Sequence, residues 1–444
     1  MRSHTRLSPW LLILASLFIV PASVAIHAAQ LQWTPATVVV DLDTAQNALI
    51  SVSTDGHVLV FNSTDPRIVN LAAGKILLLE HLGARTVTGV LRQGPITAVA
   101  TNSAALTDLV QEGTIQFPNT GSAPTIRWQQ DTDEYGLTGE VNDWKFHVQS
   151  NAENNDLDYS FVAAKDLGGL SASVNGKGEM KNNGFSFLAA IHQAKLQKLL
   201  FSTPIEGTLR IDWAAMTSGP NTGIGENRLE MPVIFKELFE ANGLPFLYQI
   251  GANLIFTPGL GGKKDAVSGG YEVKFKGTGG FTANAQEVGA IKEMEADPPS
   301  VKDTTSSALA PHGIVVAVNA PKVSLSFGLT SFMEAVNQLV SNAIKNKSSA
   351  DAFEPRLGAS LTKDTHAYFK TEGGAYVQWV AEYDYTGSGP MSMVPCTITH
   401  MRMLANSGID AKLLGLSDKS PAKFDLYDKT VTTRIPDLPI CGQK

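Results

Sequence analysis

Hydrophobic and polar residues alternate along most of this chain, in runs that end at glycine, asparagine or aspartate. In YVQWVAEYDY, residues 376–385, an apolar or aromatic set and a more polar set occupy alternate positions. A two-residue period places these two sets on opposite faces of a β-strand. Similar runs recur from residue 144 to residue 216 at the spacing of antiparallel meanders. We therefore predict a mainly β protein, with an antiparallel β-sandwich-like or meander assembly.

The first part of the pattern predicts a small β module over residues 30–120. Asp55 and Gly56 stand between two alternating runs, which is a strong hairpin signal. One short helix is expected in this module between Ser103, as the residue that caps its first turn, and Gly113, which would end it.

Residues 121–286 are predicted to form a larger antiparallel β region. Within it, residues 248–256 and 271–276 alternate as half-buried strands do. The glycine-rich segment between them lacks the spacing of either phosphate-binding loop pattern. We expect it to be a basic strand-to-strand tip that presents Lys263 and Lys264.

Proline, serine and charged residues dominate positions 287–313, which predicts a linker or long surface loop. Residues 314–444 return to strand patterns and contain one amphipathic helix, over residues 331–346. Ser331 and Glu334 have the spacing of a capping box, and apolar residues recur on one face of the helix. We expect this face to pack against the protein core; docking of a partner is the alternative.

The first 29 residues have the pattern of a secretory signal peptide. Arg2 and Arg6 precede an apolar run of about eleven residues, and small residues follow it. A membrane-spanning helix needs about 20 apolar residues, so we expect no transmembrane segment in the mature chain. The sequence therefore predicts a secreted or periplasmic protein.

Charge and cysteine content further narrow the possible partners and the cellular compartment. Without the signal peptide the chain has 33 Lys and Arg residues against 42 Asp and Glu, a net charge of −9. This acidity argues against nucleic acid as a partner. Cys396 and Cys441 are the two cysteines, and in an oxidising compartment we expect them to form a disulfide that holds the C-terminal tail.

The sequence offers few candidates for catalysis or metal binding. It contains neither the G-x-S-x-G nor the H-E-x-x-H motif, and we expect no cofactor. The nearest approach to a calcium site is the acidic stretch from residue 131 to residue 158. Its candidate ligands are Asp131, Asp133, Asp156 and Asp158, but the bidentate glutamate of a calcium loop is missing.

The run at residues 376–385 also suggests carbohydrate chemistry. Trp379, Tyr383 and Tyr385 share one face of the predicted strand and form an aromatic strip. We expect such a strip to pack in the core, as most do; stacking on sugar rings is the alternative. Glu382 and Asp384 lie on the other face, at a spacing of about 7 Å that two glycosidase carboxylates can use.

Three functions remain open from these observations. We expect a non-enzymatic protein of the cell envelope or extracellular space that acts in surface recognition or as a structural component, with a glycan or another envelope protein as partner. The alternatives are a secreted carbohydrate-active hydrolase that uses Glu382 or Asp384, and a carrier of an apolar ligand between sheets. Glycine-rich apolar strands such as IGANLIF, residues 250–256, suggest the carrier.

Overall fold

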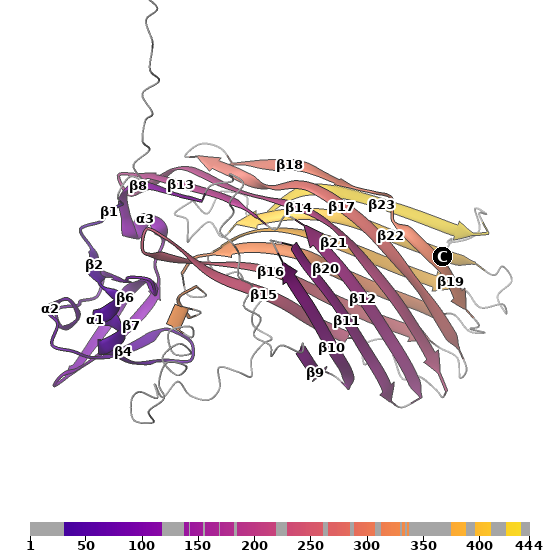
Figure 1. Cartoon of the computed structure of the whole chain (residues 1–444), viewed down its shortest axis with the longest axis horizontal. Coiled ribbons are helices and arrows are strands. Elements are labelled where there is room, and N and C mark those ends of the chain that lie inside the picture. Colours follow the sequence, from indigo (N-terminus) through magenta and orange to yellow (C-terminus); the bar gives the residue numbers. More distant parts are fainter. Residues whose placement is uncertain are drawn as a thin grey trace, which may run out of the picture.

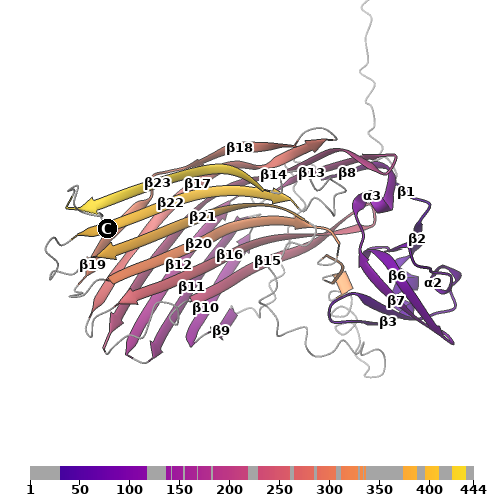
Figure 2. The ribbon, with the colours of Figure 1, turned by 180° about the vertical axis from the view of Figure 1, so that it is seen from behind.

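The computed structural model describes most of the chain after the first 30 residues. Two long β-sheets lie face to face in an elongated body, and a small module occupies one end (Figure 1). Figure 2 shows the same body from behind, with the second sheet in front. The described residues are 31–117, 137–141, 143–153, 156–167, 169–181, 184–218, 229–260, 265–284, 288–306, 312–328, 331–333, 335–336, 374–387, 396–409 and 423–436.

The large sheet contains 11 of the described strands. They are β1 (Gln32–Trp33), β8 (Val110–Phe117), β9 (Leu137–Val141), β10 (Trp144–Glu153), β11 (Asp156–Leu167), β12 (Leu170–Lys181), β13 (Ser186–His192), β14 (Lys195–Thr217), β17 (Ala266–Asn284), β18 (Val288–Ala296) and β19 (Ser300–Ser306). The strands β9, β10, β11, β12, β14 and β17 follow one another across it. At its far edge, β18 and β19 pair with successive halves of β17.

The second sheet has six strands in the described residues, all antiparallel. In spatial order they are β15 (Leu229–Ala241), β16 (Leu244–Leu260), β20 (His312–Ser326), β21 (Gly374–Gly387), β22 (Thr397–Ile409) and β23 (Lys423–Ile435). Its inner face and that of the large sheet share one continuous hydrophobic core. The predicted mainly β, antiparallel sandwich-like fold is confirmed.

The module is inserted between β1 and β8, which pair with each other in the large sheet. Its own sheet has six strands in the described residues, with three short helices alongside or after it. The elements are β2 (Thr37–Val40), α1 (Leu42–Ala48), β3 (Leu49–Val52), β4 (Val58–Asn62), α2 (Pro66–Val69), β5 (Ile76–Leu79), β6 (Gly83–Gln93), β7 (Ile96–Ser103) and α3 (Leu106–Leu109).

Alternating burial explains why these segments form long strands. Along β14, buried and more exposed residues alternate from Leu199 to Thr217, so one face meets the core and the other meets solvent. The predicted hairpin at Asp55 and Gly56 joins β3 to β4, and Gly56 has a φ of 69°, which glycine adopts without strain.

Two expectations need correction, on the linker and on the short helix. Residues 288–296 and 300–306, expected as part of a linker, are strands β18 and β19, and the prolines at 298 and 299 lie between the two strands. Residues 248–256 and 271–276 lie in strands β16 and β17, as expected; the two strands do not pair with each other, because β16 belongs to the second sheet and β17 to the large one. The short helix begins after Ala105 rather than Ser103, and Gly113 lies inside β8.

The described part of the predicted 331–346 helix packs against the module. Ser331–Met333, Ala335 and Val336 are helical. Phe332 and Val336 are buried in the module's own core, and the Phe332 ring lies 5.6 Å from the guanidinium carbon of Arg85. The expectation of a core-packing face is confirmed for these residues. None of the helices in the described chain has the length and apolarity to cross a membrane.

Candidate functional site

Strand β21 turns its aromatic strip toward the interior. Trp379, Tyr383 and Tyr385 are only 1%, 0% and 2% exposed, because their face of the strand meets the large sheet. The two predicted faces of this strand are as the sequence indicated. The strip therefore packs in the core, as expected, and offers no outward surface to a sugar ring; these rings can meet only a ligand held between the sheets.

Aromatic rings from the two sheets meet across the core. Tyr271 on β17 and Tyr383 on β21 are stacked, with ring centroids 5.8 Å apart and an interplanar angle of 21°. Trp213 on β14 also lies 5.8 Å from the Tyr383 ring. We call Trp213, Tyr271 and Tyr383 the core aromatic cluster. Trp213 and Tyr271 were not singled out from the sequence, although alternation in RIDWAAM and GYEVKF indicates their inward face.

Several polar atoms in this core have no hydrogen-bond partner. Among the described residues they include the indole nitrogens of Trp144, Trp213 and Trp379 and the hydroxyl of Tyr271. Trp213 and Tyr271 are 3% and 1% exposed, so bulk solvent does not reach these groups. Burial, and then the nearby hydroxyls of Tyr159 and Tyr383, raises the pKa of Tyr271. The cluster therefore presents neutral donors in an apolar setting.

The predicted carboxylates lie on the opposite side of β21. Glu382 is 47% exposed on the outer face, and its carboxylate is 3.9 Å from the guanidinium of Arg402, which also forms two hydrogen bonds to Asp428, of 3.0 and 2.7 Å. Asp384 is half-buried beside it on the same outer face. The aromatic strip and the carboxylates thus share no surface, and a sugar cannot meet both.

The remaining predicted site residues do not form a site in the described structure. Five of them lie outside the described residues: Lys263, Lys264, Asp131, Asp133 and Cys441. Asp156 and Asp158 are exposed on β11, and no group of three potential metal ligands occurs in the described part of the chain. Cys396 immediately precedes β22, and its disulfide with Cys441 stays a prediction.

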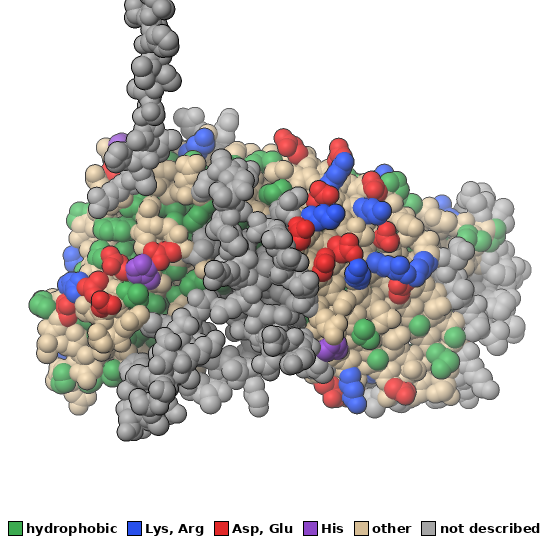
Figure 3. Space-filling model, in the orientation of Figure 1, with side chains coloured by type: hydrophobic (Ala, Val, Ile, Leu, Met, Phe, Trp, Pro, Cys, Tyr) green, Lys and Arg blue, Asp and Glu red, His purple; other side chains and the backbone are tan. Residues whose placement is uncertain are grey.

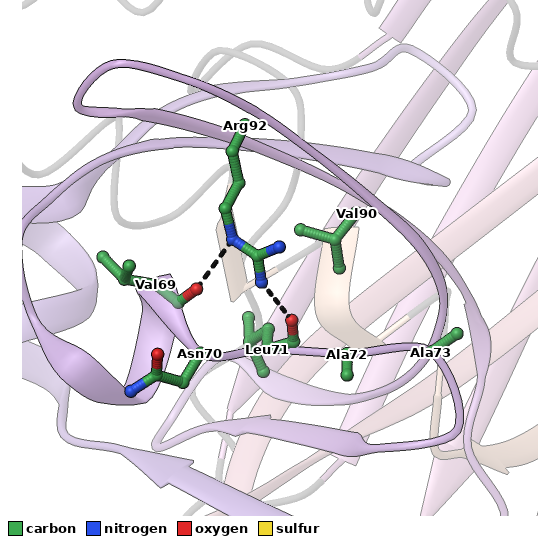
Figure 4. A pocket seen from close by; sticks show the side chains of 7 residues that line it. All are labelled: Val69, Asn70, Leu71, Ala72, Ala73, Val90 and Arg92. Carbon is green, nitrogen blue, oxygen red and sulfur yellow. Dashed lines mark hydrogen bonds between the residues drawn. The ribbon is translucent and has the colours of Figure 1, made fainter.

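An open hollow of about 650 Å³ lies on the module (Figure 4). It is lined by residues 69–73, Val90 and Arg92. Arg92 does not present its guanidinium as a free cation, because Nε donates to the carbonyl of Val69 at 2.7 Å and an Nη donates to the carbonyl of Leu71. These bonds satisfy backbone carbonyl groups at and just after the end of α2, so the position of Arg92 in the hollow has a structural explanation.

The outer face of the large sheet carries charges of both signs (Figure 3). Asp212 forms ion pairs with Arg210, at 3.0 Å, and with Lys302, while Lys276 lies 3.5 Å from Glu295. Paired charges of this exposed kind contribute little to stability, but they give the face a regular polar pattern.

Comparison with known proteins gives no assignment. No family model matches the chain, and neither the curated proteins nor the solved structures provide a match. The chemistry of the core aromatic cluster is therefore the basis for interpreting function.

Proposed function

We propose that this protein is a non-enzymatic binding protein of the cell envelope or extracellular space, and that it holds an apolar molecule between its two long sheets. The location rests on the signal-peptide pattern of residues 1–29. The ligand-binding role rests on the interior of the sandwich.

The observation that carries the proposal is the set of unpaired donors in the shared core. A buried polar group without a partner costs about 1–3 kcal/mol, and native proteins keep few of them. The indole nitrogen of Trp213 and the hydroxyl of Tyr271 both belong to the core aromatic cluster. A ligand with an apolar body and an acceptor oxygen would satisfy them while its chains replace side-chain contacts.

A second candidate is recognition through the outer face of the large sheet. The interleaved charges of Arg210, Asp212, Lys276, Glu295 and Lys302 favour it, since a regular polar face suits a partner of complementary charge. Binding of this kind would weaken steeply with added salt, whereas binding inside the sandwich would not.

Solvent extraction followed by mass spectrometry tests the interior site. The mature protein, purified from the cells that make it, should release an apolar compound in stoichiometric amount. The same protein, delipidated and refolded, should take up lipid from neutral phospholipid vesicles. An extract without apolar compound, together with no uptake by the refolded protein, would overturn the proposal.

A further inference from the structure

One row of inward-facing residues in the large sheet leads from the core aromatic cluster to the edge. Val301 on β19 lies directly opposite Tyr271 on β17, so the two side chains share the inner face. Tyr271 is 1% exposed, whereas Val301 is 42% exposed. The inner face of this sheet is therefore open to solvent one strand away from Tyr271.

A matching row crosses the second sheet. Tyr383 lies opposite Met401 on β22, and Met401 lies opposite Val431 on β23. Met401 is buried, but Val431 is 39% exposed, and Ile435 at the end of the same strand is 64% exposed. The two sheets thus have exposed apolar side chains at the same edge, which we call the lip: Val301, Val431 and Ile435.

Among the described strands, contacts close the sandwich along only part of this edge. Strand β18 lies against β22 and β23, and both views place β18 along β23 (Figures 1 and 2). After two prolines, β19 replaces β18 as the pairing partner of β17. In the described structure, β19 has no comparable contact with β23. The exposed lip coincides with the stretch where β19 forms the edge.

Met401 is the side chain between the lip and Tyr383. Its unbranched thioether side chain changes rotamer at low cost, and methionine is the residue that adapts most readily to a variable apolar occupant. The apolar chain of a ligand that enters between Val301 and Val431 can therefore reach the core aromatic cluster by displacing the Met401 side chain. No strand pairing has to break.

We infer that the sandwich takes up a long-chain acyl ester sideways through the lip, and that the ester carbonyl accepts hydrogen bonds from Trp213 and Tyr271. This inference rests on the proposed function. Trp213 can only donate, and Tyr271 remains a neutral hydroxyl donor, so the site suits an uncharged acceptor. A carboxylate buried there without a cation would carry a large desolvation cost, which disfavours a fatty acid anion.

The route is tested with a brominated long-chain acyl methyl ester, which quenches nearby tryptophan fluorescence. In the delipidated, refolded protein we expect quenching, and Val301→Glu and Val431→Glu should slow its onset at least about tenfold, since the apolar ester must then pass a carboxylate that loses hydration. Val162→Glu is the matched control, because Val162 is 50% exposed on the outer face of β11. Val301→Thr and Val431→Thr keep the test available if a glutamate variant does not fold.

The hydrogen bond from Tyr271 to the ester carbonyl, the carbonyl anchor, is tested with Tyr271→Phe. The probes are the same ester and a brominated alkane of equal length. Loss of one neutral hydrogen bond should weaken ester binding about fivefold and leave alkane binding unchanged. A merely structural Tyr271 predicts no such difference between the two probes.

The outcomes distinguish failure of the proposed function from failure of the lateral route or of the hydrogen bond to the ester carbonyl. No quenching of the wild-type protein by either probe contradicts the proposed function itself. Quenching at an unchanged rate in both lip variants overturns the lateral route, and equal ester affinity in wild type and Tyr271→Phe overturns the carbonyl anchor.

Discussion

The ring of Phe161 lies across Gly176, its direct partner on the neighbouring strand. A Cβ atom on Gly176 would stand 2.0 Å from Cζ of the ring. Tyr159 and Gly178, the next inward-facing pair, repeat the arrangement with a distance of 2.1 Å to Cζ of the tyrosine. Because glycine has no side chain, each ring can lean over its partner strand and cover the backbone there.

Replacing Gly176 with alanine should destabilise the sandwich by about 1–3 kcal/mol, because the added methyl group forces the Phe161 ring out of its position. The free energy of unfolding in urea measures the effect. Gly89→Ala is the control, since its nearest neighbour, Ala100 Cβ, would be 3.8 Å from the new methyl group. Equal stability of the two variants would contradict this account of the ring.

Phe332→Ala should destabilise the module by about 3–5 kcal/mol. Phe332 is fully buried in the module's core and lies so close to Gly83 that a Cβ there would be 3.2 Å from the phenylalanine side chain. Limited proteolysis should then cut the module before the sandwich. Phe332→Leu should have a smaller effect, and a protease pattern that matches the wild type in both variants would show that the contact is dispensable.

The module should lose stability in acid through Asp41. The backbone N–H and hydroxyl of Thr44, followed by Arg67, lower the pKa of Asp41 to about 2 from its ordinary value of 3.8. A depressed folded-state pKa gives stability that is present above pH 3.8 and is lost as the pH falls toward 2. Thermal melts across this window should therefore fall less steeply in Asp41→Asn than in wild type. Asp43→Asn, with the same change of charge, should follow the wild type; identical slopes in all three would refute the assignment.

The predicted disulfide between Cys396 and Cys441 is open to a chemical test. Closing a loop of about 45 residues should contribute roughly 3–4 kcal/mol, so a reductant should lower the melting temperature of the wild type. Cys396→Ser should show the lower value without reductant and no further change with it. Two free thiols in the unreduced, unfolded protein would rule the pairing out.

Glu382→Gln separates a binding protein from a hydrolase. Glu382 lies on the outer face with Arg402, away from the core aromatic cluster, so the variant should bind the acyl ester with wild-type affinity. Loss of a glycan-cleaving activity in this variant would instead support the carbohydrate-active alternative.

The sequence predicted the fold class and the two faces of β21, because alternation specifies which side chains lie together. It did not specify which face is covered, since that depends on the second sheet, and the strip at Trp379 was therefore open to two interpretations, core packing and sugar binding. Prolines at 298 and 299 suggested a linker, although they only separate two edge strands. Helix α1 was missed because its seven residues are too few for a helical period to show, although Asp41 caps it.

Contacts between segments far apart in the chain could not be predicted from the sequence either. Tyr271 and Tyr383 are 112 positions apart, and neither position indicates that their rings stack. The candidate site consists of such pairs, whereas the residues proposed from local motifs are exposed, lie outside the described chain or, like the strip on β21, face inward.

A crystal structure of the protein saturated with a long-chain acyl ester tests the central claim most directly. The account predicts continuous ligand density between β17 and β21, with the ester carbonyl oxygen within hydrogen-bond distance of Trp213 Nε1 and the Tyr271 hydroxyl. An unchanged core, with Tyr271 and Tyr383 still stacked and the ester absent from the space between the sheets, would contradict it.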